Sequence, residues 1–225
     1  MATIGENLQG AKARIERAAR AAGRDPRSVT LLAVSKTHPV ERIAAAQAAG
    51  QRAFGENYVQ EALAKMEALP GLEWHLIGPL QSNKTRVAAE RFDWVQTVDR
   101  ARIANRLSEQ RPAHLPPLNV LIQVNVSAEA TKSGVAVTEV TALAAAIAPL
   151  PRLRLRGLMA VPAPGSGGGF LQMKDLYERL RERFGFDTLS MGMSDDMEAA
   201  IAQGSTMVRI GTAIFGERRP QKAAA

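Results

Sequence analysis

The chain has 225 residues, of which 46% are hydrophobic and 23% charged, and it contains no cysteine. This composition is typical of a soluble globular protein, and it excludes disulfide frameworks, thiolate metal sites and cysteine nucleophiles. A lack of cysteine is compatible with a cytoplasmic location. The net charge is +7, but the basic residues are scattered and aromatic residues make up only 4%. We therefore do not expect nucleic-acid binding to be the main function.

Two further classes are not expected. The three histidines, His38, His75 and His114, lack the spacing of a metal site, so no metal is predicted. No run of about 18 apolar residues exists that could span a bilayer, so no membrane contact is predicted.

In chain order, residues 3–22 are expected to form an amphipathic helix that ends at Gly23. Short strands then alternate with helices along the chain. The expected strands are 30–35, 52–54, 74–77, 94–98, 119–126, 153–159, 188–191 and 206–210. The expected helices are 39–49, 58–69, 82–91, 100–110, 137–148, 171–184 and 195–202.

Alternating strands and helices specify a parallel sheet, because each crossover needs a helix to return the chain. Eight units of this length predict a single α/β domain over residues 1–225, a (β/α)8 TIM-type barrel with an additional N-terminal helix. Its core is expected to span about 28–216, with a frayed tail at 217–225. An open doubly wound sheet is the alternative, although no glycine-rich dinucleotide fingerprint follows the first strand.

Active sites of such barrels lie at the C-terminal ends of the strands. Lys36 follows the first strand and shares a strand face with Leu32 and Val34. If those two side chains fill the barrel interior, Lys36 stands at the mouth. A lysine at a strand end can simply reach into water. The alternative is a Schiff-base lysine, whose amine becomes nucleophilic when it is partly desolvated beside a cation.

The last strand offers that cation. Arg209 shares a face with Met207, and in a closed barrel the last strand neighbours the first. An inward Arg209 would place a guanidinium near the mouth, or would form an ion pair with an acid of another strand.

Ser194, Gly211 and Thr212 fall in the loops after the last two strands, where barrels most often bind phosphate. Ser194 or Asp195 could instead cap the helix expected at 195–202. An amine, a guanidinium and a phosphate site together would suit pyridoxal 5′-phosphate, which carries an aldehyde, a ring acceptor and a phosphate. A lysine-dependent aldolase acting on a phosphosugar remains a rival interpretation.

Several segments resemble the pyridoxal phosphate homeostasis proteins, formerly called proline synthetase co-transcribed proteins. These segments are 33–37 (AVSKT), 54–58 (FGENY), 74–78 (WHLIG), 81–84 (QSNK), 156–159 (RGLM) and 190–216. The resemblance implies an alanine-racemase N-terminal-like barrel with Lys36 bonded to the cofactor. It also implies that Arg209 faces the pyridine nitrogen, that Ser194, Gly211 and Thr212 bind the phosphate, and that Asn57 contacts the cofactor.

One departure is the segment 164–169, which is shorter than the family's usual loop. The resemblance further implies a monomer. Because the cofactor site looks complete and a second catalytic domain is missing, the leading hypothesis is a carrier that controls the level of free pyridoxal 5′-phosphate and delivers it to apo-enzymes.

Catalytic turnover is not expected, so no catalytic residues are assigned. The barrel uses the chain through about residue 215, which leaves little for the second domain that completes related racemases. An arginine facing the pyridine nitrogen keeps it unprotonated and weakens the ring as an electron sink. The alternative is a racemase-like enzyme acting on an amino acid, for which His75 or Tyr58 would be the base at the mouth.

Overall fold

The structure, a computed structural model, describes residues 2–127, 133–162 and 167–217. Parallel strands form a closed barrel, in which each strand pairs with the next, β4 pairs with β5, and β9 returns to pair with β1. These strands are β1 (Thr30–Val34), β2 (Ala53–Glu56), β3 (Glu73–Leu76), β4 (Trp94–Val98), β5 (Leu118–Asn125), β7 (Leu153–Met159), β8 (Thr188–Ser190) and β9 (Met207–Ile210). The predicted barrel is confirmed, and the open sheet is excluded.

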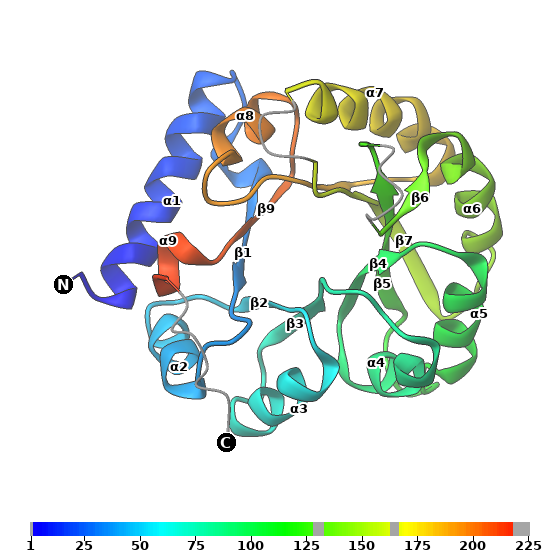
Figure 1. Cartoon of the computed structure of the whole chain (residues 1–225), viewed down its shortest axis with the longest axis horizontal. Coiled ribbons are helices and arrows are strands. Elements are labelled where there is room, and N and C mark those ends of the chain that lie inside the picture. Colours follow the sequence, from blue (N-terminus) through cyan, green and yellow to red (C-terminus); the bar gives the residue numbers. More distant parts are fainter. Residues whose placement is uncertain (1, 128–132, 163–166, 218–225) are drawn as a thin grey trace.

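Helices surround the barrel as an outer ring (Figure 1). They are α2 (Val40–Ala48), α3 (Val59–Ala68), α4 (Thr85–Arg91), α5 (Ala101–Gln110), α6 (Val140–Ile147), α7 (Gly167–Phe184) and α8 (Met197–Ala202). Single 3-10 turns, η1 (Pro26–Ser28), η2 (Ser82–Lys84) and η3 (Val137–Glu139), precede β1, α4 and α6.

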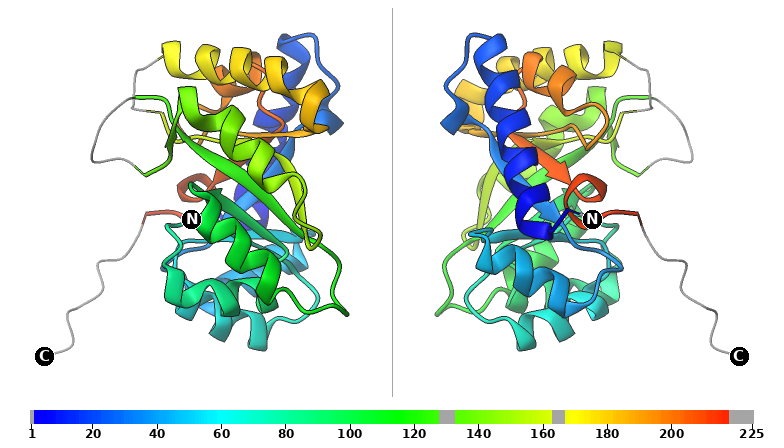
Figure 2. Two further views of the ribbon diagram at one scale, coloured as in Figure 1. Left: turned by 90° about the vertical axis from the view of Figure 1, so that its right-hand side faces the viewer. Right: turned by 90° about the vertical axis from the view of Figure 1, so that its left-hand side faces the viewer.

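The additional N-terminal helix, α1 (Ile4–Ala21), completes this ring between α8 and α2 and also packs against α9 (Thr212–Phe215) (Figures 1 and 2). A capping box starts it, because the Thr3 hydroxyl accepts from the Glu6 N–H and the Glu6 carboxylate accepts from the Thr3 N–H. Its buried face is Leu8, Ala11, Ile15, Ala18 and Ala19.

The apolar core divides into two parts. The larger part fills the layer between the outer surface of the barrel and the helices. A small separate cluster of Trp94, Leu121 and Met159 comes from β4, β5 and β7. The barrel interior also contains polar side chains: Gln96 on β4 bonds to Ser190 on β8, and these strands are not neighbours in the sheet. Such a contact must cross the lumen.

Two short elements were not predicted from the sequence. β6 (Val135–Ala136) adds to the end of β5, and α9 follows β9 directly. Both are shorter than the stretches over which hydrophobic periodicity can be recognised. Helix α7 begins at Gly167, four residues before the expected 171. Residues 164–166 of the predicted short loop lie outside the described residues, and residues 167–169 belong to α7 rather than to a loop. The predicted frayed tail beyond 217 also lies outside the described residues.

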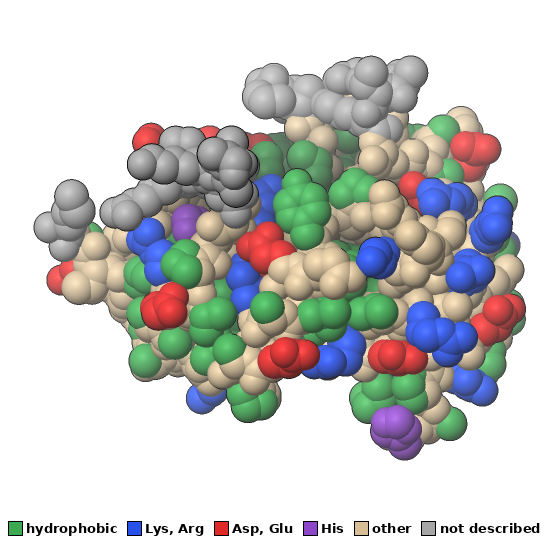
Figure 3. Space-filling model, turned by 60° about the horizontal axis from the view of Figure 1, so that its bottom comes forward, with side chains coloured by type: hydrophobic (Ala, Val, Ile, Leu, Met, Phe, Trp, Pro, Cys, Tyr) green, Lys and Arg blue, Asp and Glu red, His purple; other side chains and the backbone are tan. Residues whose placement is uncertain are grey.

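Within the described ranges, no helix combines the length and apolar character needed to cross a membrane. The same residues contain no group of three or more histidine, aspartate or glutamate side chains placed to hold a metal ion. On the face that carries α2, α3 and α4, basic and acidic side chains are interspersed (Figure 3). This face therefore lacks the continuous basic stripe that a nucleic-acid backbone requires.

Candidate functional site

Lys36 lies where the first and last strands meet. It follows β1, is half-buried, and lines a small pocket together with Gly211 and Thr212, which follow β9. Val34, His38 and Gly216 complete that lining. β1, β9 and α9 lie side by side at this point (Figure 1). Three of the predicted site residues, separated by about 175 positions in the chain, are therefore brought together at the C-terminal ends of the strands.

Gly211 permits this close approach. A Cβ at this position would lie 3.2 Å from the Val34 carbonyl oxygen and 3.4 Å from the Val34 Cβ. Any side chain would push the end of β9 away from the end of β1. The glycine thus keeps the segment that follows β9 against the strand that carries Lys36.

The backbone around Lys36 is held by a buried ion-pair cluster that no sequence pattern indicated. Lys65 on α3 donates to Glu56 at 2.7 Å, to Glu61 at 2.6 Å and to the Ser35 carbonyl oxygen at 2.8 Å. We call Glu56, Glu61 and Lys65 the Lys65 cluster. The Ser35 hydroxyl also donates to Glu56, at 2.6 Å. The residue before Lys36 is therefore fixed through both its backbone and its side chain.

The residue after Lys36 is fixed by the same cluster. The N–H of Thr37 donates to Glu61 at 2.5 Å, and Thr37 adopts a φ of 65°. A non-glycine residue in the left-handed region costs about 1–3 kcal/mol and persists only where its surroundings hold it. The Lys65 cluster supplies those contacts, so Lys36 sits between two restrained neighbours.

The Lys65 cluster is expensive to desolvate. The side chains of Lys65 and Glu56 are 4% and 0% exposed, and one carboxylate oxygen of Glu56, Oε2, has no hydrogen-bond partner in the described part of the chain. Burial raises the pKa of Glu56 above its ordinary value, and the charge of Lys65 opposes that rise. This buried arrangement lies directly behind Lys36 and restrains both of its neighbours in the chain.

Asn57 lies in the loop that follows β2. Its backbone passes very close to Gly78 in the loop after β3. A Cβ added to Gly78 would lie only 2.1 Å from the Asn57 carbonyl oxygen. Among the described residues, Asn57 is not part of the lining that Lys36 shares with Gly211 and Thr212. The structure therefore fixes the Asn57 backbone near the mouth without placing its side chain in that pocket.

Neither Ser194 nor Asp195 caps α8, although capping was one of the two interpretations of Ser194. The N-cap of α8 is Asp196, without a side-chain hydrogen bond. The Ser194 hydroxyl instead accepts from the Ala213 N–H of α9 at 3.4 Å. The capping interpretation is wrong because α8 begins only at Met197, two residues later than expected. Ser194 consequently lies beside the first turn of α9, which follows Gly211.

Arg209 points into the barrel and is 5% exposed. Its guanidinium donates to the Ser190 hydroxyl and to the Ala160 carbonyl oxygen, both at 2.8 Å. The alternative of an ion pair with an acid of another strand is wrong for the described residues, since both partners are neutral. Burial lowers the pKa of Arg209 to about 10, so it stays cationic at neutral pH. A buried cation whose partners are neutral is suited to a ligand that accepts a hydrogen bond.

Of the two candidate bases, His75 is not at the mouth. It is fully buried in the barrel, stacks on Trp94 at 5.0 Å, and bonds to Glu73 and Gln96. The prediction that places His75 at the mouth is therefore wrong, because its position in β3 lies deep inside the barrel. Tyr58 precedes α3, is 61% exposed, and lines a surface groove with Thr37.

Comparisons with known proteins agree with this geometry. Residues 7–219 match the model of the alanine racemase N-terminal domain family. A "Pyridoxal phosphate homeostasis protein" of Escherichia coli strain K12 is 59% identical, over 97% of this chain and 98% of that protein. The protein of the same name from Pseudomonas aeruginosa is also 59% identical, over 97% of each chain.

Solved structures show the same similarity. PipY of Synechococcus elongatus PCC7942, solved "with PLP bound", superposes with a TM-score of 0.77 at 38% identity, covering 90% of this chain and 99% of PipY. Alanine racemase from Corynebacterium glutamicum shares the fold alone, with a TM-score of 0.72 at 20% identity, and this chain covers 62% of it. This chain therefore belongs to the alanine racemase N-terminal domain family and, within it, to the pyridoxal phosphate homeostasis proteins.

Proposed function

We propose that this protein binds pyridoxal 5′-phosphate through Lys36 and acts in cofactor homeostasis, holding and releasing the cofactor without catalytic turnover. The observation that carries the proposal is the pocket at the seam between β1 and β9, where Lys36 stands beside Gly211 and Thr212. The relatives named for pyridoxal phosphate homeostasis and the PLP-bound PipY structure support it.

The proposal assigns a partner in this chain to each part of the cofactor. Ser194, Gly211 and Thr212 gather where the phosphate would bind, with small side chains and a close backbone approach. Arg209 is a buried cation with N–H groups to donate to the ring nitrogen. Lys36 supplies the amine, and Asn57 is proposed as a further contact near the mouth.

The proposed function requires only one reaction of the chain, reversible imine formation at Lys36. The unprotonated Lys36 amine adds to the cofactor aldehyde, a C=N bond replaces the C=O bond, and the oxygen leaves as water. The reaction is reversible, so an incoming amine can displace Lys36 and carry the cofactor away. When bound, the cofactor could supply an electron sink, but a guanidinium that only donates a hydrogen bond to its nitrogen weakens that property.

The proposed role includes delivery to apo-enzymes that use the cofactor. We further propose a cytoplasmic monomer formed by a single domain over the whole chain. Sedimentation of the purified protein with and without the cofactor tests the monomer, which a stable dimer would contradict.

Reduction with borohydride tests the attachment to Lys36. Purified protein is mixed with pyridoxal 5′-phosphate, reduced and digested, and the modified residue is located by mass spectrometry. We expect the adduct on Lys36 and a visible absorbance band that Lys36→Ala removes. Lys12→Ala is the matched control, because Lys12 is also half-buried but lines a pocket with the first residues of β1 and β2, at the other end of the barrel. Equal labelling of both variants would contradict the proposal.

A racemase-like enzyme is the second candidate, and the exposed Tyr58 at the rim of the mouth is the observation that favours it. Steady amino-acid turnover by the cofactor-loaded protein, lost in Tyr58→Phe, would establish the enzyme and refute the carrier.

A further inference from the structure

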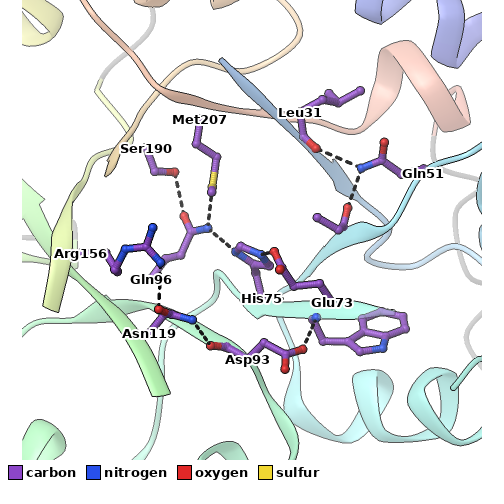
Figure 4. Close-up of polar contacts among 12 residues, drawn as sticks. Leu31, Gln51, Glu73, His75, Asp93, Gln96, Asn119, Arg156, Ser190 and Met207 are labelled. Atoms are coloured by element: carbon purple, nitrogen blue, oxygen red, sulfur yellow. Dashed lines mark hydrogen bonds and ion pairs between the residues drawn. The ribbon is translucent and has the colours of Figure 1, made fainter. Parts of the chain in front are cut away.

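A hydrogen-bonded chain of side chains runs through the barrel interior from Arg209 to the opposite end. Arg209 donates to the Ser190 hydroxyl at 2.8 Å, and that hydroxyl donates to Oε1 of Gln96 at 2.7 Å. Nε2 of Gln96 bonds to Nδ1 of His75 at 2.9 Å, and Nε2 of His75 bonds to Glu73 at 2.7 Å. Figure 4 shows the part from Ser190 to Glu73. We call these five residues the through-barrel chain.

The through-barrel chain connects the two ends of the molecule. Arg209 also bonds to the carbonyl oxygen of Ala160, the residue after the last of β7, at the C-terminal end of the strands. Glu73 is the first residue of β3, at the N-terminal end, and its side chain is 48% exposed. The members between these ends, Ser190, Gln96 and His75, are all 0% exposed. Bulk solvent therefore does not reach these three side chains.

Each donor in the through-barrel chain points the same way. Because Oε1 of Gln96 accepts from Ser190, its Nε2 must be the donor toward His75. Nδ1 of His75 is then an acceptor, so its proton is on Nε2 and faces Glu73. Aligned donors polarise one another, and here a cation stands at the first donor and a carboxylate at the last acceptor. Inverting the Gln96 amide alone would set its Oε1 against the acceptor Nδ1 of His75, and moving the His75 proton alone to Nδ1 would set two donors face to face.

The surroundings of His75 favour this arrangement. Burial lowers the pKa of His75, so the ring is neutral and can accept from Gln96. Glu73 and Asp93 are the acids that face it, and Arg156 lies over the ring of Trp94, on which His75 stacks. The sulfur of Met207 accepts from the same amide nitrogen of Gln96, at 3.2 Å, and so fixes the amide further.

We infer that Ser190, Gln96 and His75 are positioning residues, which hold the Arg209 guanidinium in the orientation that faces the cofactor ring. The inference rests on the proposed function, because it assumes that Arg209 meets the ring nitrogen. It adds that the affinity and the spectrum of the bound cofactor depend on side chains that do not touch it.

The test compares Gln96→Met with Ser205→Ala. Gln96→Met keeps the length of the side chain and removes both its donor and its acceptor. Ser205→Ala is the matched control, because Ser205 is equally buried and bonds to three carbonyl oxygens of β8, β9 and the Met191 segment, without contacting Arg209. We expect Gln96→Met to weaken pyridoxal 5′-phosphate binding about tenfold and to shift its absorbance band. Ser205→Ala should lower thermal stability and leave both properties unchanged. Unchanged affinity and band in folded Gln96→Met would overturn the inference.

A second readout needs no cofactor. The chain has only three histidines, so imidazole nitrogens can be assigned by NMR in the free protein. We expect His75 to carry its proton on Nε2 from about pH 5 to 8, and to lose that fixed state in Gln96→Met. A proton on Nδ1 in the parent protein would overturn the inference. If that tautomer is found but the parent protein binds no pyridoxal 5′-phosphate, the proposed function fails and the link to the cofactor fails with it, while the hydrogen-bonded chain stands.

Discussion

Replacing Lys65 by methionine tests how the ion-pair cluster behind Lys36 stabilises the protein. Lys65 contacts two carboxylates and one carbonyl oxygen, and its side chain is only 4% exposed. Without it, Glu56 stays buried with no cation beside it. Removing one partner of a buried pair typically costs about 3–5 kcal/mol. For a chain of this size each kcal/mol lowers Tm by about 2–4 °C, so we expect a decrease of about 6–20 °C.

The second substitution separates an unpaired charge from simple loss of packing. In the Lys65→Met background, Glu56→Gln removes the buried charge, so the double variant should recover a large part of the lost stability. Lys174→Met is the control on α7, with an expected effect within about 0.5 kcal/mol. Calorimetry of the four proteins at one pH measures these differences. A Lys65→Met variant with the parent's Tm, or a double variant less stable than the single one, would refute the reasoning.

The pH dependence gives an independent check. Burial already raises the pKa of Glu56, and loss of the Lys65 charge should raise it further. An acid with a raised folded-state pKa loses stability as the pH rises through that value, because folding then requires burying the charge. Lys65→Met should therefore be least impaired in acid, and its deficit relative to the parent should grow toward neutral pH. The same variant should react more slowly with pyridoxal 5′-phosphate, since Ser35 loses its bond from Lys65, and Glu61, which holds the Thr37 N–H, loses its cation.

Three further outcomes are expected. Pyridoxal 5′-phosphate at about 100 times its Kd should stabilise the parent by about 2.7 kcal/mol in thermal unfolding, and Lys36→Ala should lose this effect. Acidification below about pH 6.5 should destabilise the parent more than the His75→Gln variant, because burial lowers the pKa of His75 and only the unfolded chain then binds a proton at this residue. Denaturant midpoints at several pH values measure the difference. Gly78→Ala should cost about 1–3 kcal/mol, because its Cβ would meet the Asn57 carbonyl oxygen at 2.1 Å; urea unfolding with Gly10→Ala, where the added Cβ meets nothing within 4 Å, is the control.

The barrel and the position of Lys36 were predictable because both follow from local patterns. Alternating strands and helices fix the fold class, and period-two alternation placed Leu32 and Arg209 on inward faces, in agreement with the register that pairs them. The Lys65 cluster was not predictable, because no sequence pattern indicates that a lysine on the outer helix α3 is buried and paired with Glu56 and Glu61. The depth of His75 was equally inaccessible, because alternation gives the face of a side chain but not its height in a tilted barrel.

The seam between β1 and β9 has a consequence for synthesis of the chain. The amine that we propose to capture the cofactor, on Lys36, is made about 175 residues before Gly211, the glycine that shapes its pocket. A nascent polypeptide that lacks β9 thus contains Lys36 but not the pocket that Gly211 and Thr212 form around it. Ligand capture can begin only once the ends of the sheet have joined, an event of high contact order. Binding of pyridoxal 5′-phosphate should therefore occur only after β9 has paired with β1 and closed the barrel. A chain truncated before residue 207 should not bind the cofactor.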